Sequence, residues 1–254
     1  MTRVALTIAG SDPSGGAGLQ ADLRAFADFG VYGEAVVTLI TVQNTRRLTR
    51  VEHLAADLVV GQIAAVMEDI PPHAAKIGAL GSRAVVEAVA EAARSFDFPL
   101  VVDPILSGTL GGLLEEGAFE ALVRVLLPQA YLLTPNLGEA AAIAGFPVED
   151  RASMVAAARE IQRRGARNVL VKGGHLIHHQ PGEALDVLVI EHGGVHEFSA
   201  LRIETPHTHG SGCRYAAAIT AELAKGTGLI EAVGRAKRYV TEVISLSLGR
   251  GPLP

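Results

Sequence analysis

Residues 3–42 read RVALTIAGSDPSGGAGLQADLRAFADFGVYGEAVVTLITV. The apolar runs 3–9 and 34–42 are typical of buried strands, whereas residues 18–30 carry apolar side chains at the spacings of an amphipathic helix. A strand, a helix and a second strand in this order predict two parallel strands joined by a crossover helix.

The same alternation continues along the chain. It predicts further strands at 74–79, 99–103, 130–134 and 168–172, and helices at 57–70, 82–96, 116–127 and 153–165. Ser82 and Ser153 stand where N-caps are expected. Beyond residue 180, short strands turn at Gly193-Gly194 and are expected to be antiparallel, before two closing helices at 212–225 and 229–248. The sequence therefore predicts one doubly wound α/β domain over 1–254, with a mostly parallel sheet and helices on both faces.

Composition narrows the class of partner. The 254 residues are 49% hydrophobic with a net charge of −5, and no cluster of Lys or Arg stands out. Nucleic acid and anionic membranes are therefore not expected as partners. No apolar stretch approaches the roughly 20 residues of a membrane span. One cysteine rules out an intramolecular disulfide, and a cytoplasmic location is expected.

Polar residues and glycines follow six predicted strands at the point where each ends. They are Gly10-Ser11-Asp12, Gln43-Asn44, Gly78, Asp103-Pro104, Thr134-Pro135-Asn136 and Lys172-Gly173-Gly174. Ligands of open α/β sheets bind at the carboxyl ends of the strands. These residues therefore predict one shared cleft.

The glycine-rich segment 10–22 has three competing interpretations. A P-loop is excluded because no Lys follows the glycines. Gly16-Ala17-Gly18-Leu19-Gln20-Ala21 fits a dinucleotide fingerprint, but the strand ends too early and Gln43 stands where an acid is required. The third interpretation is a substrate loop in which Ser11, Asp12 and Asp22 offer polar contacts while the glycines let a flat ligand approach. A plain glycine-rich turn is the simpler alternative.

Gly210-Ser211-Gly212-Cys213 opens a predicted helix. Small residues at a helix N-terminus expose free N–H groups, and the helix dipole adds partial positive charge, which suits a phosphoryl group in transfer. The same field, with Arg214 beside it, is expected to lower the pKa of Cys213, so that a thiolate could accept a proton from a substrate hydroxyl. The alternatives are a buried structural cysteine and, with His207 and His209, a zinc site.

Asn136 and Glu139 are three residues apart on the first turn of a predicted helix. Glu139 could hold Mg²⁺ through water, assisted by Asp103 from the neighbouring strand end. The alternative is helix capping by Asn136, with Glu139 favouring the helix dipole.

From Ala5 to Pro252 the chain resembles the hydroxymethylpyrimidine/phosphomethylpyrimidine kinases of thiamine biosynthesis, a branch of the ribokinase-like superfamily. The resemblance is carried by ALTIAGSDPSGGAGLQADL, TVQNT, KIGAL, VVDP, TPNLGEA, VLVKGGH and THGSGC. It implies ATP-dependent phosphorylation of a hydroxymethyl group and then of the monophosphate, on a ribokinase-like fold that is commonly a homodimer.

The resemblance also implies roles for individual residues. Asp22 and Gln43 match the positions that hold the aminopyrimidine, and Gly10, with Asp12 in the same loop, lines that pocket. Lys172 matches the position near the nucleotide phosphates, and Asn136 with Glu139 matches the motif that positions Mg²⁺. Asn136 and Thr205 are also expected on the ATP side, and Asp103 beside the metal. Cys213 matches the catalytic base, behind Gly210, Ser211 and Gly212.

This chain departs from the family in two places. The loop ILSGTLGG (105–112) is one residue shorter than usual and lacks a Lys, which puts the second phosphorylation in question. His207 and Arg214-Tyr215-Ala216 also replace the usual residues, and Arg214 could supply the lost charge. The rival functions are pyridoxal/pyridoxine kinase and a non-catalytic pyrimidine-binding protein of the same fold.

Overall fold

A single large sheet organises the molecule. The computed structural model describes residues 2–106, 112–174, 182–205 and 209–247, and these form nine strands in the spatial order β3-β2-β1-β4-β5-β6-β7-β8-β9. The strands are β1 (Val4–Ser11), β2 (Tyr32–Gln43), β3 (Leu48–His53), β4 (Ala74–Ile77), β5 (Leu100–Val102), β6 (Leu132–Leu133), β7 (Asn168–Gly173), β8 (Glu183–Val189) and β9 (Val195–Leu201). β3, β8 and β9 pair antiparallel with their neighbours and the other pairs are parallel, which confirms the predicted doubly wound, mostly parallel fold.

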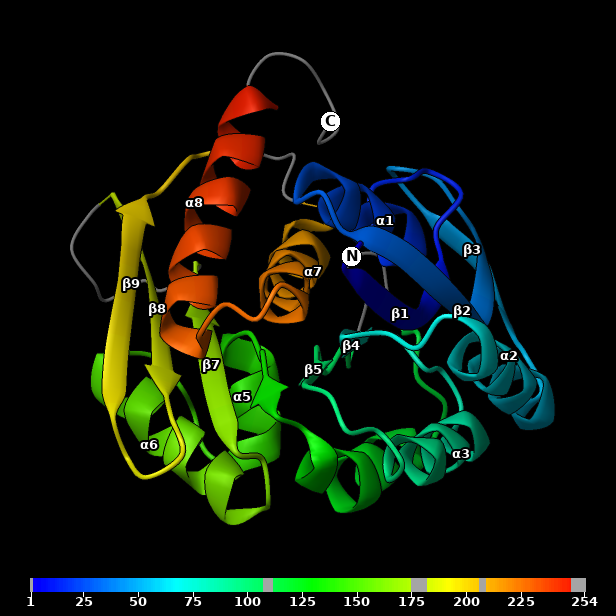
Figure 1. Ribbon diagram of the computed structural model, residues 1–254. Coiled ribbons are helices and arrows are strands. Elements are labelled where there is room, and N and C mark those ends of the chain that lie inside the picture. Colours follow the sequence, from blue (N-terminus) through cyan, green and yellow to red (C-terminus); the bar gives the residue numbers. More distant parts are fainter. Residues whose placement is uncertain (1, 107–111, 175–181, 206–208, 248–254) are drawn as a thin grey trace.

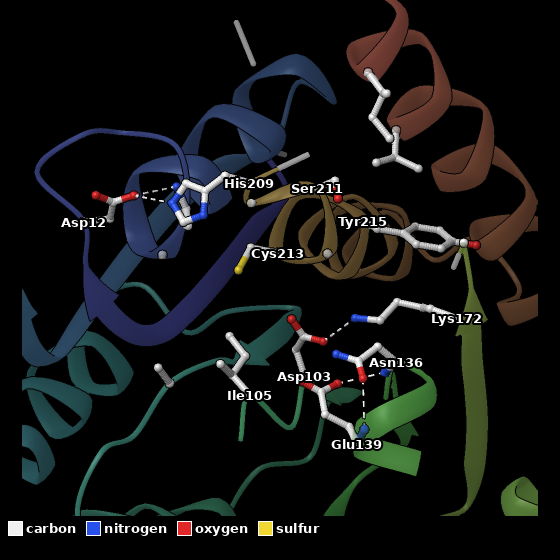
Figure 2. A pocket seen from close by; sticks show the side chains of 18 of the residues that line it. Asp12, Asp103, Ile105, Asn136, Glu139, Lys172, His209, Ser211, Cys213 and Tyr215 are labelled. Carbon is white, nitrogen blue, oxygen red and sulfur yellow. Dashed lines mark hydrogen bonds and ion pairs between the residues drawn. The ribbon is translucent and has the colours of Figure 1, made fainter. Parts of the chain in front are cut away.

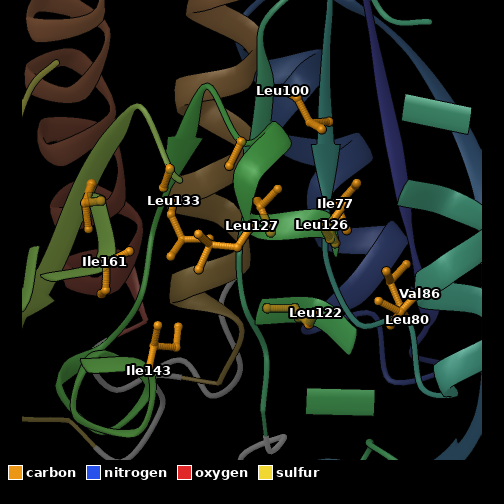
Figure 3. Packing of buried hydrophobic residues seen from close by; sticks show 14 of the residues in the cluster. Ile77, Leu80, Val86, Leu100, Leu122, Leu126, Leu127, Leu133, Ile143 and Ile161 are labelled. Carbon is orange, nitrogen blue, oxygen red and sulfur yellow. The ribbon is translucent and has the colours of Figure 1, made fainter. Parts of the chain in front are cut away.

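Helices cover both faces of the sheet (Figure 1). One face packs against α1 (Gly18–Asp28), α7 (Ser211–Ala224) and α8 (Leu229–Leu246). The other packs against α2 (Ala56–Asp69), α3 (Arg83–Ala93), α4 (Ala118–Ala121), α5 (Leu137–Ala144) and α6 (Arg151–Arg163). The buried cluster between the sheet and this second set of helices is rich in Val, Leu and Ile, and Figure 3 shows Leu126, Leu127 and Leu133 within it.

Burial explains why the central strands do not alternate between apolar and polar residues. All residues of β4 and β5 are buried, and in β1 only Ser11 is not. Strands covered on both faces need apolar side chains on both. β9 instead alternates between half-buried and exposed residues, as an edge strand does.

Three local expectations need correction. β3 was not expected, because its sequence LTRVEH alternates and carries charges. Ser153 does not cap α6; Asp150 does, and Ser153 completes the capping box from the third helical position.

The helix expected at 116–127 is α4 followed by a π-helical turn, Leu122–Leu126, and a 3₁₀ turn, Leu127–Gln129, that contains Pro128. The N-cap at Ser82 is confirmed, since its side chain accepts from the Val85 N–H.

Within the described ranges, every helix is too short or too polar to span a membrane.

Candidate active site

One cavity of about 680 Å³ opens at the carboxyl ends of the parallel strands. Most of the predicted strand ends contribute to its lining: Gly10, Ser11, Asp12, Gln43, Asp103, Asn136, Lys172 and Gly174. Gly210 to Cys213 enter from the start of α7, and Thr205 lies beside them in the lining. The prediction of a shared cleft is confirmed. Figure 2 shows Ser211 and Cys213 on one side of the cavity and Asp103, Asn136, Glu139 and Lys172 on the other.

Asp12 organises the glycine-rich loop. Its Oδ1 accepts from the Ser14 N–H at 2.8 Å, and its Oδ2 accepts from the Ala17 N–H at 2.9 Å and lies 3.2 Å from His209 Nε2. Burial alone would raise the pKa of Asp12, but hydrogen bonds from His209, Gln43 and Ser14 hold it well below its ordinary value. Asp12 therefore lines the cavity as an ionised residue that also ties the loop to the start of α7.

The two glycine clusters pack against each other. Gly210, the N-cap of α7, has a φ of 81°, and a Cβ there would lie 1.8 Å from the Gly16 carbonyl oxygen. Gly18 has a φ of 58°, and its Cβ would lie 2.3 Å from the Gly10 carbonyl oxygen. No other residue fits either position without moving the backbone. The opening loop thus supports the N-terminus of α7 in addition to lining the cavity.

The expected low pKa of Cys213 is wrong. Cys213 is 8% exposed, and burial raises the pKa of its thiol to about 11, with the Lys76 ammonium opposing the rise. Desolvation of the thiolate outweighs the field of the helix N-terminus. The thiol is therefore neutral near pH 7 until another charge stabilises the thiolate.

Arg214 does not replace the charge missing from the shortened loop. Its side chain is 1% exposed and is absent from the lining of the cavity. One step along a helix turns a side chain by about 100°, so Arg214 points away from the direction of Cys213. Arg214 lies near Tyr239 of α8; burial raises the pKa of Tyr239, and Arg214 opposes that rise. Of the shortened loop, residues 107–111 lie outside the described residues, as does His207.

Asp22 lies behind the cavity and Lys76 takes the place expected for it. The Asp22 carboxylate is fully buried, accepts from Thr7 Oγ1 at 2.7 Å and from Lys76 Nζ at 2.7 and 2.8 Å, and is absent from the lining. Lys76 does line the cavity. Burial alone would lower the pKa of Lys76, but Asp22 raises it above the ordinary value. The contact of Asp22 with substrate stays a prediction, and in this structure Lys76 stands between the Asp22 carboxylate and the cavity.

Lys76 was missed at the sequence level, although its setting in the apolar segment AAKIGA was visible. A charged side chain in a strand buried on both faces requires a partner, and that requirement could have drawn attention to it.

The opposite side of the cavity holds a second set of charges. Lys172 Nζ donates to Asp103 Oδ1 at 2.7 Å, and Thr134 Oγ1 donates to the same oxygen at 2.9 Å. Burial alone would raise the pKa of Asp103, but the ammonium groups of Lys172 and Lys76 hold it below its ordinary value. Asp103 thus remains an anion at the end of β5.

Asn136 and Glu139 form a capping box at the start of α5, so the capping interpretation is confirmed. Asn136 N–H donates to Glu139 Oε2 at 2.8 Å, and Glu139 N–H donates to Asn136 Oδ1 at 2.9 Å. Burial raises the pKa of Glu139 to about 7; Lys172 opposes the rise and Asp103 adds to it. A buried carboxylate with this environment is stabilised by an added cation.

The zinc alternative includes His207, which lies outside the described residues, so that alternative is not tested. Across the described ranges, no group of three or more His, Cys, Asp or Glu side chains is arranged to hold a metal. Two carboxylates, Asp103 and Glu139, do fit a hydrated Mg²⁺, which takes one or two protein carboxylates and completes its shell with water and phosphate oxygens.

These features define a class of enzyme. One end of the cavity is surrounded by a helix N-terminus with free N–H groups, a lysine and two carboxylates, and it lies at the carboxyl ends of the strands of an α/β sheet. Small-molecule phosphotransferases use groups of these kinds. The chain belongs to the phosphomethylpyrimidine kinase family, whose model matches residues 12–254. Membership implies that the chain is a kinase, uses ATP and acts on a small molecule.

Relatives cover the whole chain. It is 46% identical to the hydroxymethylpyrimidine/phosphomethylpyrimidine kinase of Rhizobium meliloti (strain 1021), over 100% of this chain and 97% of that protein. It is 41% identical to the enzyme of the same name from Haemophilus influenzae (strain Rd), over 98% and 94%.

Solved structures agree with this assignment. The phosphomethylpyrimidine kinase of Clostridium difficile 630 superposes with a TM-score of 0.83 at 40% identity, over 96% of this chain and 100% of that one. The ADP complex of Bacillus subtilis pyridoxal kinase superposes with a TM-score of 0.86 at 34% identity, over 96% and 92%. The ribokinase-like resemblance is confirmed.

Proposed function

We propose that this kinase transfers the γ-phosphoryl group of ATP to the hydroxymethyl group of 4-amino-5-hydroxymethyl-2-methylpyrimidine, and then to the resulting monophosphate, to supply thiamine biosynthesis. One observation carries the proposal: a single cavity contains both the Gln43 end and the Lys172 end, with the start of α7 in its lining. Full-length relatives at 41–46% identity bear the names of kinases with these substrates.

The Gln43 end receives the pyrimidine. Gln43 offers an amide that can donate and accept to an aminopyrimidine edge, while Gly10 leaves room beside the ring. Leu39 and Leu48 add apolar surface to the same end. Lys76, held by Asp22, provides the fixed positive charge on this side.

The Lys172 end receives the phosphates of ATP. The substrate oxygen bonds to the γ-phosphorus, the bond from that phosphorus to the leaving oxygen breaks, and ADP departs. The N–H groups at Ser211 and Gly212 face the transferred group, and the hydroxyl proton passes to Cys213 as a thiolate. Burial disfavours that thiolate, and Lys76 opposes the effect of burial.

Mg²⁺ is assigned to Glu139 and Asp103 on the fit of these carboxylates. When bound, the ion neutralises charge on the phosphate oxygens. Lys172 and Asn136 orient those carboxylates through the ion pair and the capping box already described.

Pyridoxal is the second candidate acceptor, and a specific observation favours testing it. The Bacillus subtilis pyridoxal kinase is among the structural neighbours, with a TM-score of 0.86. Its 34% identity is lower than the 40% of the phosphomethylpyrimidine kinase from Clostridium difficile, so the pyrimidine is preferred. A non-catalytic binding protein is not supported, because the family and the full-length relatives are kinases.

The proposal is tested by ATP-dependent phosphate transfer with purified protein, followed by product mass. Hydroxymethylpyrimidine, its monophosphate and pyridoxal are supplied in parallel with Mg²⁺, and a Cys213→Ala variant serves as the reference. Transfer to both pyrimidines is expected. Transfer to the free alcohol alone would assign the loss of the second step to the shortened loop at 105–112, and transfer to pyridoxal alone would replace the proposal by its rival.

The homodimer and the cytoplasmic location stay predictions.

A further inference from the structure

A pair of charged side chains borders the cavity on the side away from Gln43. Lys237 of α8 donates from Nζ to Asp186 Oδ2 of β8 at 2.7 Å. The two side chains are 9% and 3% exposed, and both line the cavity. Neither residue belongs to the reaction centre described above.

Asp186 makes a second contact that reaches the phosphate side. Its Oδ1 accepts from the Gly173 N–H at 3.0 Å. In the antiparallel pairing of β7 and β8, Asp186 stands opposite Lys172, and the pairing ends one step later at Gly173 and Leu185. A Cβ at Gly173 would lie 2.2 Å from the Leu185 carbonyl oxygen, so only glycine fits this position without moving the backbone.

Three hydrogen bonds thus form one chain of interactions across the cavity. Lys237 holds Asp186, Asp186 holds the Gly173 N–H, and the adjacent Lys172 places its Nζ 2.7 Å from Asp103. Figure 2 shows Lys172 extending from the end of its strand toward Asp103. Movement at Gly173 would therefore displace the ammonium group of Lys172.

Stability alone does not account for the pair. α8 already packs on its neighbours through buried apolar residues, among them Val233, Ala236 and Val240. A buried ion pair adds little net stability compared with apolar residues of the same volume, because both charges lose their hydration. A role at the cavity is the better explanation of its position.

We propose that Asp186 and Lys237 are positioning residues for nucleotide binding, which hold the end of β7 so that Lys172 meets the phosphates of ATP. The inference rests on the proposed function, in which ATP is the phosphate donor. A hydrogen bond to a charged carboxylate is stronger than one to a neutral acceptor. Lys237 fixes that carboxylate, so loss of either side chain loosens the Gly173 N–H and, with it, Lys172.

The test measures the Kd of ADP by calorimetry and the KM values of ATP and the acceptor pyrimidine. Asp186→Asn, Lys237→Met and the double variant Asp186→Asn/Lys237→Met are compared with the natural protein. Each variant is expected to raise the Kd of ADP and the KM of ATP about ten-fold, while the KM of the pyrimidine stays within two-fold. A merely structural role would not separate the two KM values.

Two controls keep the result interpretable. Arg235→Gln removes another ion pair of α8, with Glu222 of α7, away from the cavity lining, and is expected to leave the Kd of ADP unchanged. The double variant leaves no unpaired buried charge, so it decides the matter if a single variant fails to fold.

The inference is overturned if the folded double variant binds ADP as tightly as the natural protein, or if the KM values of ATP and pyrimidine rise together. Failure of the proposed function is a separate result. In that case the natural protein transfers no phosphate to either pyrimidine, while its affinity for ADP remains measurable and still responds to the variants.

Discussion

The reactivity of Cys213 depends on one buried cation at its side of the cavity. Five influences act on the thiol: burial raises its pKa, Lys76 lowers it, the carboxylates of Asp22 and Asp103 raise it, and a hydrogen bond from the Gly18 backbone lowers it. Lys76 is the larger of the two influences that favour the thiolate. A proton acceptor at this position therefore requires Lys76 as well as the helix N-terminus.

Replacing Lys76 by Gln is expected to raise the pKa of Cys213 by roughly 1 unit, since a nearby opposite charge shifts a pKa by about that much or more. Cys213 is the single cysteine of the chain, so its alkylation by iodoacetamide reports on this thiol alone. The rate at pH 9 is expected to fall several-fold, and the midpoint of the pH profile to move above the natural value of about 11.

Asp22→Asn/Lys76→Gln is the matched control, because Lys76→Gln leaves the buried Asp22 without its cation. The effect of Lys76 on the thiol exceeds that of Asp22, so the double variant is still expected to react more slowly than the natural protein. Unchanged alkylation in a double variant with a native circular dichroism spectrum would refute the role of Lys76.

Glu139 provides a pH-dependent prediction. Burial raises its pKa in the folded protein from 4.5 to about 7, so folding favours the protonated acid. The corresponding stability is fully present below pH 4.5 and is lost as the pH rises through about 7. Relative to Glu139→Gln, the natural protein is therefore expected to lose up to about 3 kcal/mol of unfolding free energy over this range.

Thermal and denaturant unfolding from pH 4.5 to 8 measures this difference. Glu91→Gln, at an exposed position of α3, should show no such trend. Mg²⁺ with ADP should remove most of the loss if Glu139 helps to hold the ion, because a cation favours the carboxylate. Parallel stability profiles for the natural protein and Glu139→Gln would contradict the prediction.

At the scale of elements, the junction between the opening loop and α7 is the most constrained part of the site. Gly210→Ala combines a φ of 81° with a Cβ only 1.8 Å from the Gly16 carbonyl oxygen. The positive φ alone costs about 1–2 kcal/mol, and the clash must displace the helix N-terminus. We expect a lower Tm and a loss of about 100-fold in kcat, as when one preorganised donor is removed.

Gly61→Ala is the control for this substitution. Gly61 lies within α2 with no atom near the added Cβ, so the change is expected to stabilise the protein by about 0.5–1 kcal/mol and to leave kcat unchanged. Equal behaviour of the two alanine variants would show that the junction is not constrained as described.

Which elements could be predicted depends on whether local sequence or tertiary context specifies them. Local sequence is enough to specify β1, β4 and α1, because the strands are apolar runs and the helix has an amphipathic pattern. Their positions were therefore predicted within a few residues. β3 has no apolar run and is held by pairing with β2 at the sheet edge. The π-helical turn after α4 has no counterpart in the spacing of apolar residues, which is the same for the helix predicted there.

For the molecule as a whole, the location of the site was predictable and the direction of its side chains was not. Parallel strands bring their carboxyl ends together, so Gly10, Gln43, Asp103 and Lys172 meet in one cavity. The positions of Asp22, behind the cavity, and of Arg214, outside its lining, depend on which helix face meets the sheet and which meets the cavity. Lys76 became visible as a functional residue only when the partner of Asp22 was known.

The outer face of β2 suggests how two chains would associate. Ile40 and Val42 are 47% and 55% exposed and alternate along β2, so they lie on the same face. Leu39 and Thr41 point to the other face and line the cavity. Contiguous exposed apolar surface is typical of association sites; we therefore predict that the homodimer forms through this part of the sheet.

Sedimentation at micromolar concentration should give twice the 26.5 kDa of one chain, and Ile40→Ser/Val42→Ser should shift it to the monomer. Ile230→Ser, at an exposed apolar residue of α8, should not. Because the reverse face of β2 borders the pyrimidine end, loss of the dimer is also expected to raise the KM of the acceptor more than that of ATP. A natural protein that sediments as a single chain would refute the association, and a monomeric variant with unchanged KM values would separate association from catalysis.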